Sequence, residues 1–170
     1  MARYQATLRS RRPAAETFGY LATFSNAAEW DPGVLEGEQL GSGPVGPGTR
    51  FRLVVPFLGR RLTLVYRVTG YQPDHAVTLT ATSGVLHATD TIVVTPAAGG
   101  SAVSYEAEVR FRGPLRLFDP LLRPGFRAVA GRAAGGLGRV LAADPAAGST
   151  VSPAAPPRPG APGAARTDTS

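Results

Sequence analysis

Apolar and polar side chains alternate without exception in VSYEAEVRF, residues 103–111. Successive side chains of a β-strand point to opposite faces of its sheet, so this pattern predicts a strand with one apolar face. The positions assigned to that face are Val103, Tyr105, Ala107, Val109 and Phe111.

The segments before this strand alternate in the same way and are separated by turn-forming residues such as Gly59-Arg60 and Ala97–Gly100. Strands joined so closely should form an antiparallel meander with one apolar face. The inward positions predicted for it are Phe51, Leu53, Val55 and Phe57; Leu62, Leu64, Tyr66 and Val68; Val77, Leu79 and Ala81; and Ala88, Asp90, Ile92 and Val94.

A further strand is predicted at residues 4–10. Pro13 then begins a short helix. Ser25-Asn26 either ends this helix or caps a second short helical turn. The segment 113–143 supplies a cover for the sheet, because its large apolar residues recur at steps of three and four. Pro120 and Pro124 predict a broken start and a main helix from about Gly125, in which several glycines allow close approach to the sheet.

One folded domain is predicted over residues 1–143, followed by a disordered tail rich in Pro, Ala and Gly over residues 144–170. The start of the chain has no apolar core of a signal peptide, no apolar run is long enough to span a membrane, and cytoplasm is the expected location. Whether the protein forms oligomers is left open.

All 18 basic residues are Arg, Cys is absent, and the formal net charge is +6. The arginines are scattered among the strands, which favours a solvated surface over a nucleic-acid or anionic-lipid partner. The absence of Cys excludes disulfides and thiolate zinc sites, and the two His have no partner at metal-ligand spacing. We therefore expect no metal, no other cofactor and no nucleic acid.

A strand, two short helices, a long antiparallel meander and a C-terminal amphipathic helix form an order that resembles the helix-grip fold of the START/Bet v 1-like superfamily. The match looks closest to bacterial SRPBCC proteins of the polyketide cyclase/dehydrase-like kind. The stretches that carry the resemblance are Arg12–Phe18, Trp30–Val34, Gly46–Phe51, Tyr66–Val68, Ala88–Ile92 and Gly113–Leu117.

The resemblance implies an α+β fold in which a curved antiparallel sheet of about six to seven strands wraps around a long C-terminal helix, with two short helices after the first strand. It also implies an elongated apolar cavity for a lipid, polyketide or other hydrophobic molecule. No catalytic residue is shared across the superfamily, so the resemblance assigns none.

Asp90 is the carboxylate of most interest, because the alternation places it on the apolar face between Ala88 and Ile92. A carboxyl group there has a raised pKa unless it is paired, which suits a general acid or base. Tyr66 and Tyr105 share that face and could bond to Asp90 or orient a ligand carbonyl. A structural role for Asp90 at the rim of the sheet, paired with Arg or backbone N–H groups, is the competing interpretation.

Asp31 precedes Pro32-Gly33 and is interpreted as a turn former, which leaves its neighbour Trp30 as a candidate cavity wall. His87 falls on the opposite, Thr-rich face, unless the register slips by one residue. The residues expected to line a cavity are Trp30, Phe51, Leu53, Val55, Leu64, Tyr66, Asp90, Tyr105, Phe118, Phe126 and Val129.

Three functions fit these features. The first is a module that binds or carries a hydrophobic small molecule in the cavity. The second is a polyketide cyclase/aromatase or dehydratase in which Asp90, Tyr66 and Tyr105 act on a poly-keto chain. The third is a protein that binds a membrane surface or a partner through its arginines and its Pro-rich tail, without insertion into the membrane.

Overall fold

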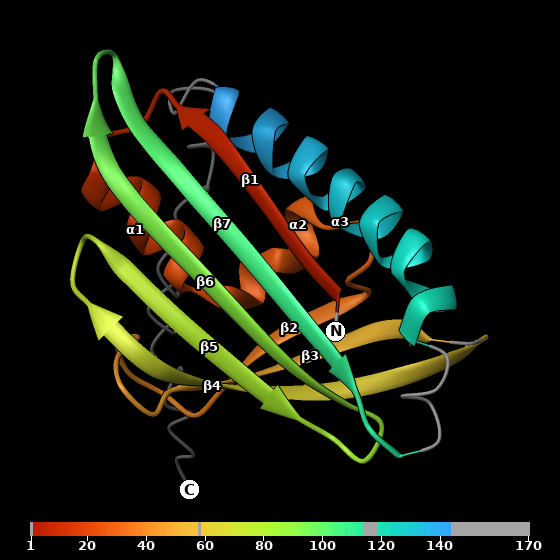
Figure 1. Ribbon diagram of the computed structural model, residues 1–170. Coiled ribbons are helices and arrows are strands. Elements are labelled where there is room, and N and C mark those ends of the chain that lie inside the picture. The colour runs from red at the N-terminus through yellow and green to blue at the C-terminus, as the bar shows by residue number, and fades with distance from the viewer. Residues whose placement is uncertain (1, 58, 114–118, 144–170) are drawn as a thin grey trace, which may run out of the picture.

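Seven strands form a single antiparallel sheet in the computed structural model (Figure 1). They are β1 (Ala2–Ser10), β2 (Glu36–Leu40), β3 (Arg50–Phe57), β4 (Arg60–Gln72), β5 (Ala76–Thr82), β6 (Leu86–Ala97) and β7 (Gly100–Phe111). Their spatial order is β1-β7-β6-β5-β4-β3-β2, so the meander from β2 to β7 is continuous and β1 is added beside β7.

The structure describes residues 2–57, 59–113 and 119–143, and residues 119–130 by their backbone alone. The predicted tail, residues 144–170, lies outside this range. In the described part of the chain, no helix is long and apolar enough to cross a membrane.

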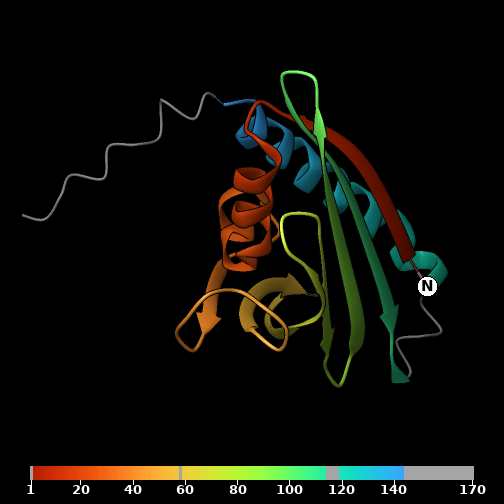
Figure 2. The same ribbon diagram turned by 90° about the vertical axis from the view of Figure 1, so that its left-hand side faces the viewer.

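Three helical segments follow β1 and lie together on one side of the sheet: α1 (Ala14–Ala22), the 3-10 turn η1 (Phe24–Asn26) and α2 (Ala27–Trp30) (Figures 1 and 2). The C-terminal helix, α3 (Asp119–Ala142), runs along β1 and also contacts α2. The expected α+β helix-grip architecture is therefore present, with seven strands.

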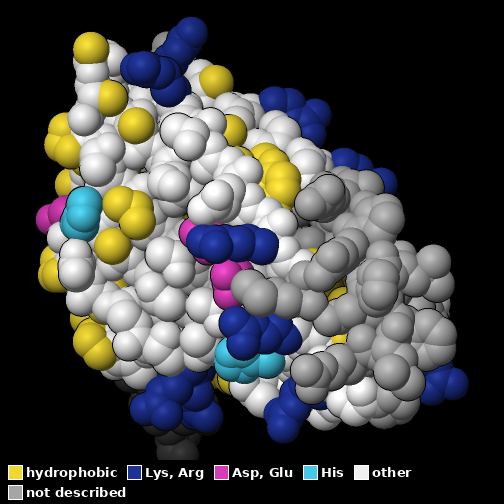
Figure 3. Space-filling view, viewed as in Figure 1, with side chains coloured by type: hydrophobic (Ala, Val, Ile, Leu, Met, Phe, Trp, Pro, Cys, Tyr) yellow, Lys and Arg dark blue, Asp and Glu magenta, His cyan; other side chains and the backbone are white. Residues whose placement is uncertain are grey.

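The two faces of the sheet differ in polarity, as the alternation predicts. The inward side chains of the central strands, among them Val77, Leu79, Val94 and Val103, are fully buried under the helices. The outward face carries many polar side chains, threonines such as Thr78 and Thr91 among them. Hydrophobic side chains are scattered between them and do not cover the face (Figure 3). Burial of the apolar face is the main force that holds the helices against the sheet.

The sheet curls until strands that are not neighbours meet. Phe57 at the end of β3 stacks on Phe111 at the end of β7, with ring centroids 5.9 Å apart and an interplanar angle of 24°. Three strands, β4, β5 and β6, separate β3 from β7 in the sheet order. The two rings therefore close a seam across one end of the curl.

Helix α3 begins at Asp119, earlier than the start near Gly125 expected from its prolines. Pro120 falls in the first turn, where a backbone N–H has no partner within the helix, so its missing N–H costs little. In the C-terminal half of α3, Ala133, Leu137 and Leu141 are buried and Val140 is half-buried, as expected for a helix that lays one apolar face on the sheet.

Gly136 permits the contact between α3 and the end of α2. A Cβ at this position would overlap the backbone carbonyl oxygen of Trp30, whereas a Cβ at Gly135 would meet no atom within 4 Å. Of these two adjacent glycines, only Gly136 is required by packing.

We predict that Gly136→Ala destabilises the protein by about 1–3 kcal/mol, because α3 must move away from Trp30 to accept the methyl group. Gly135→Ala, on the exposed side of the same turn, should instead stabilise it by up to about 1 kcal/mol through helix propensity. Urea unfolding of the two variants measures both effects. Equal effects would contradict the close packing of α3 on α2.

Candidate functional site

Asp90 lies in the middle of β6 with its side chain directed into the apolar interior. Its neighbours across the sheet are Leu79 of β5 and Ala107 of β7. The residue is 5 % exposed. The burial that the alternation predicts for this carboxyl group is therefore present, and the register has not slipped.

Tyr105 of β7 donates a hydrogen bond of 2.5 Å from its hydroxyl to Oδ1 of Asp90. The Tyr66 hydroxyl, reaching in from β4, also interacts with this carboxyl group. Burial, together with the charge of Asp90, raises the pKa of both phenols well above the ordinary value. Both tyrosines therefore stay protonated, and Tyr105 acts as a donor toward Asp90.

Aromatic rings from the helical segments surround the two tyrosines. Trp30, at the end of α2, packs edge-on against Tyr105 with centroids 6.0 Å apart. Phe24 of η1 packs edge-on against Tyr66 at 5.0 Å and against Phe51 at 6.4 Å. These contacts fix the positions of both phenol rings and wall the carboxyl group with apolar surface.

Asp31 forms the turn that its sequence context predicts, and Oδ1 accepts a 2.7 Å hydrogen bond from the backbone N–H of Gly33. Burial raises the pKa of Asp31, while the Gly33 N–H and the positive charge of Arg132 on α3 lower it. Asp31 is also close enough to Asp90 for its charge to raise the pKa of that residue. A second acid therefore contributes to the electrostatics of the Asp90 site.

Burial raises the pKa of Asp90 from an ordinary value near 3.8 to about 6. The hydrogen bond from Tyr105 and the interaction with the Tyr66 hydroxyl oppose this increase, and the charge of Asp31 adds to it. Transfer of a carboxylate into an apolar interior disfavours its charged form, and these phenols compensate only in part. Asp90 is thus largely ionised at neutral pH and is protonated in mild acid.

The inward face is buried around Asp90 and becomes more exposed only toward one end of the strands. Val94 and Val103 are completely buried, whereas Tyr66 and Tyr105 keep 8 % and 7 % of their surface exposed. Farther along β7, Val109 and Phe111 are half-buried. Solvent access therefore increases along the inward face toward the end that carries the Phe57–Phe111 seam.

The other residues expected to line a cavity fall into three groups. Phe51, Leu53 and Leu64 are buried on the inward face, and Val55 is half-buried on it. Phe118 lies outside the described residues, as do the side chains of Phe126 and Val129.

Sequence reasoning missed three contributors: Phe24, the electrostatic role of Asp31, and Arg132. Phe24 sits in a 3-10 turn between two short helices, where no apolar periodicity marks it. The Pro-Gly turn explained Asp31 completely at the level of sequence, and only the fold brings its charge near Asp90. Arg132 is one of many scattered arginines.

The histidines take structural positions away from Asp90. Nδ1 of His75 lies 3.1 Å from the carbonyl oxygen of Val94, and Nδ1 of His87 lies 2.9 Å from the Thr82 hydroxyl on the outward face. Within residues 2–57, 59–113 and 119–143, no group of three or more His, Cys, Asp or Glu side chains could hold a metal ion.

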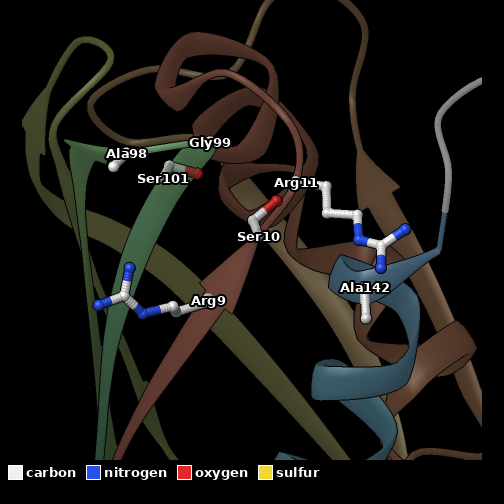
Figure 4. Close-up of a pocket in the computed structure, with 7 residues that line it drawn as sticks. All are labelled: Arg9, Ser10, Arg11, Ala98, Gly99, Ser101 and Ala142. Carbon is white, nitrogen blue, oxygen red and sulfur yellow. The ribbon is translucent and has the colours of Figure 1, made fainter.

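A surface hollow of about 210 Å³ lies far along β6 and β7 from Asp90, where the β6–β7 turn meets the ends of β1 and α3 (Figure 4). Its lining residues are Arg9, Ser10, Arg11, Ala98, Gly99, Ser101 and Ala142. The buried hydroxyls of Ser10 and Ser101 are already bonded to Thr17, and Ser101 also donates to the Arg12 carbonyl. These bonds join β1, β7 and α1 and leave the hydroxyls committed to the fold.

Comparison with known proteins found one matching family and many similar folds. The profile of a family described as polyketide cyclase / dehydrase and lipid transport matches residues 1–142. A search of curated proteins found no match.

Three solved structures illustrate the similarity in fold. A protein from Thermus thermophilus is 14 % identical with a TM-score of 0.65, over 82 % of this chain and 95 % of its own. A START superfamily protein from Mycobacterium smegmatis is 13 % identical with a TM-score of 0.64, over 83 % and 97 %. The Zhui aromatase/cyclase from Streptomyces sp. R1128 is 16 % identical with a TM-score of 0.63, over 82 % and 90 %. At these identities the similarity establishes the fold alone.

The raised pKa of Asp90 makes the stability of the fold depend on pH. The folded protein binds the Asp90 proton more tightly than the unfolded chain does, so this contribution is complete below the unfolded pKa near 3.8 and is lost as the pH rises through about 6. The free energy of unfolding of the wild type, minus that of Asp90→Asn, should therefore fall by roughly 2 kcal/mol between about pH 4.5 and about pH 8.

Chemical denaturation across this pH range measures the difference, with Asp31, Tyr66, Tyr105 and Arg132 left intact in both proteins. Asp74→Asn, in the exposed turn between β4 and β5, is the matched control and should give a difference constant to within about 0.5 kcal/mol. A pH-independent difference for Asp90→Asn would show that Asp90 keeps an ordinary pKa.

Proposed function

Because the chain belongs to the polyketide cyclase / dehydrase and lipid transport family, we propose that it binds a hydrophobic small molecule between the sheet and its helices. In this proposal the Asp90 centre, defined as Asp90 with Tyr66 and Tyr105, is the polar anchor for the ligand. The apolar inward face of the sheet contacts the rest of the molecule.

The observation that carries the proposal is the buried carboxylate itself. An unpaired ionised group in an apolar interior costs several kcal/mol, and the hydroxyls that face Asp90 are neutral donors that only partly offset this. An apolar residue at the same place would make a more stable core. A polar centre maintained inside an apolar lining is the usual arrangement of a small-molecule site.

The pattern of exposure supports a route to this centre. Val55, Val109 and Phe111 on the inward face are half-buried, and they lie toward the end of the curled sheet that carries the Phe57–Phe111 seam. Apolar side chains such as Val55 and Leu64 line that direction, as binding of an alkyl or polyketide chain requires.

Ala107 offers a way to block the site without removing its polar groups. It faces inward directly opposite Asp90, so Ala107→Leu would add bulk beside the carboxylate. Ala102 on the outward face of the same strand is a matched control, because Ala102→Leu makes the same chemical change away from the interior. We expect Ala107→Leu to weaken binding of a fluorescent apolar probe by about tenfold or more and Ala102→Leu to change it by less than about twofold.

Probe titration and native mass spectrometry of the purified protein give the two readouts, and circular dichroism establishes that both variants are folded. Equal affinity of the folded Ala107→Leu variant and the wild type would place the probe elsewhere. A failure of any apolar probe or lipid extract to bind the wild type would refute the proposal.

A second candidate function, cyclisation or dehydration of a bound poly-keto chain, is favoured by one observation. With a pKa of about 6, Asp90 is a base poised near neutrality, as deprotonation of a carbon between two carbonyls requires. In such a step the Asp90 carboxylate would take the proton, and the resulting enolate carbon would attack a second carbonyl of the same chain. Because Tyr105 donates to Asp90, this tyrosine would tune the base instead of polarising the substrate.

For the catalytic candidate, Asp90→Asn should abolish turnover of a cyclisable poly-keto substrate while leaving its binding within a few-fold of the wild type. Product formation followed by mass spectrometry, with binding measured separately, distinguishes the two effects. Unchanged turnover in Asp90→Asn would eliminate Asp90 as the base.

A further inference from the structure

The Asp90 centre has more free hydrogen-bond acceptor positions than the Tyr105 donor fills. A phenol has one O–H donor, and that of Tyr105 is used by Asp90, toward which the Tyr66 hydroxyl is also directed. An ionised carboxylate has about four acceptor positions, of which the Tyr105 hydroxyl occupies one. The centre therefore has acceptor positions to spare, while the O–H donor of Tyr105 is already engaged.

The charges around the centre also favour a ligand group that is positively charged or donates hydrogen bonds. Asp31 adds a second carboxylate, and its Oδ1 is satisfied by Gly33 while the rest of the group keeps acceptor capacity. Arg132, an exposed residue of α3, is the cation whose charge acts on Asp31. Among the side chains that the structure describes, these two carboxylates outnumber the one arginine, so the potential that the three groups produce at the centre is negative when both acids are ionised.

From this geometry we infer that the ligand presents a hydrogen-bond-donating head group to Asp90, an ammonium or amine in preference to a hydroxyl, and that a carboxylate or phosphate head group is excluded. The inference rests on the proposed function and specifies the ligand class of the same site. An ammonium would donate to the open acceptor positions and neutralise the surplus negative charge. An anion would be repelled by the two carboxylates.

The chain as a whole carries a net positive charge, opposite in sign to the potential inferred at the centre, and this makes a test with charged probes more stringent. Its formal net charge is +6, so non-specific attraction to the surface favours an anionic amphiphile. A preference for a cationic amphiphile must therefore arise locally at the Asp90 centre.

Three probes with the same alkyl chain separate the possibilities: decylamine, decanol and decanoate, each below its micelle-forming concentration at a pH of about 7.5. Trp30, the only tryptophan, packs against Tyr105, so its fluorescence reports occupancy beside the centre. Isothermal titration calorimetry supplies an independent affinity. We expect decylamine to bind on the order of tenfold or more tightly than decanoate, with decanol between them.

Asp90→Asn should remove most of this selectivity, because the amide replaces a charged acceptor with a group that also donates. Asp74→Asn removes the same charge from an exposed turn and should leave the order of the three affinities unchanged. Equal affinities, or tighter binding of decanoate, would overturn the inference while the proposed function stands. Binding of none of the three probes would overturn the proposed function and the inference with it.

Discussion

Every other part of the structure depends on the covering of one apolar sheet face. Seven antiparallel strands that alternate apolar and polar residues produce one wide apolar face. Exposure of this face to water is unfavourable, and a single sheet cannot bury it alone. The chain covers this face with helices of two kinds: a short helical cluster contributes Phe24 and Trp30, and one long C-terminal helix lies along the edge strand β1. Because the sheet curls, these few helices are enough to cover its apolar face.

Within that covered face, Asp90 places a carboxyl group among apolar side chains. Its carboxyl group has aromatic neighbours on the helical side and accepts a hydrogen bond from Tyr105 of the adjacent strand β7. The same burial that raises its pKa also strengthens its electrostatic interactions, because the local dielectric constant is low. The proposed preference for a donor head group and the cost in stability at neutral pH therefore have one physical origin.

The sequence predicted the sheet well because period-two alternation is a local signal that each strand carries for itself. It placed Asp90, Tyr66 and Tyr105 on one face for the same reason, and the pairing register then brought them together. The start of α3 was misjudged because a proline near a helix N-terminus interrupts the pattern without ending the helix. Asp31 and Arg132 could not be assigned to the centre, since their proximity to it arises from segments distant in sequence and has no periodic signature.

The Phe57–Phe111 contact gives the curled sheet an unusual mechanical property. Elsewhere around the curl, neighbouring strands are joined by ladders of backbone hydrogen bonds, and parting them would break several bonds at once. At the seam the joined strands are not neighbours, and a stacked pair of rings is worth only about 0.5–1.5 kcal/mol beyond the area it buries. In the described part of the chain, the seam between β3 and β7 is thus held by side chains and not by a backbone ladder, at the end where the half-buried residues of β7 lie.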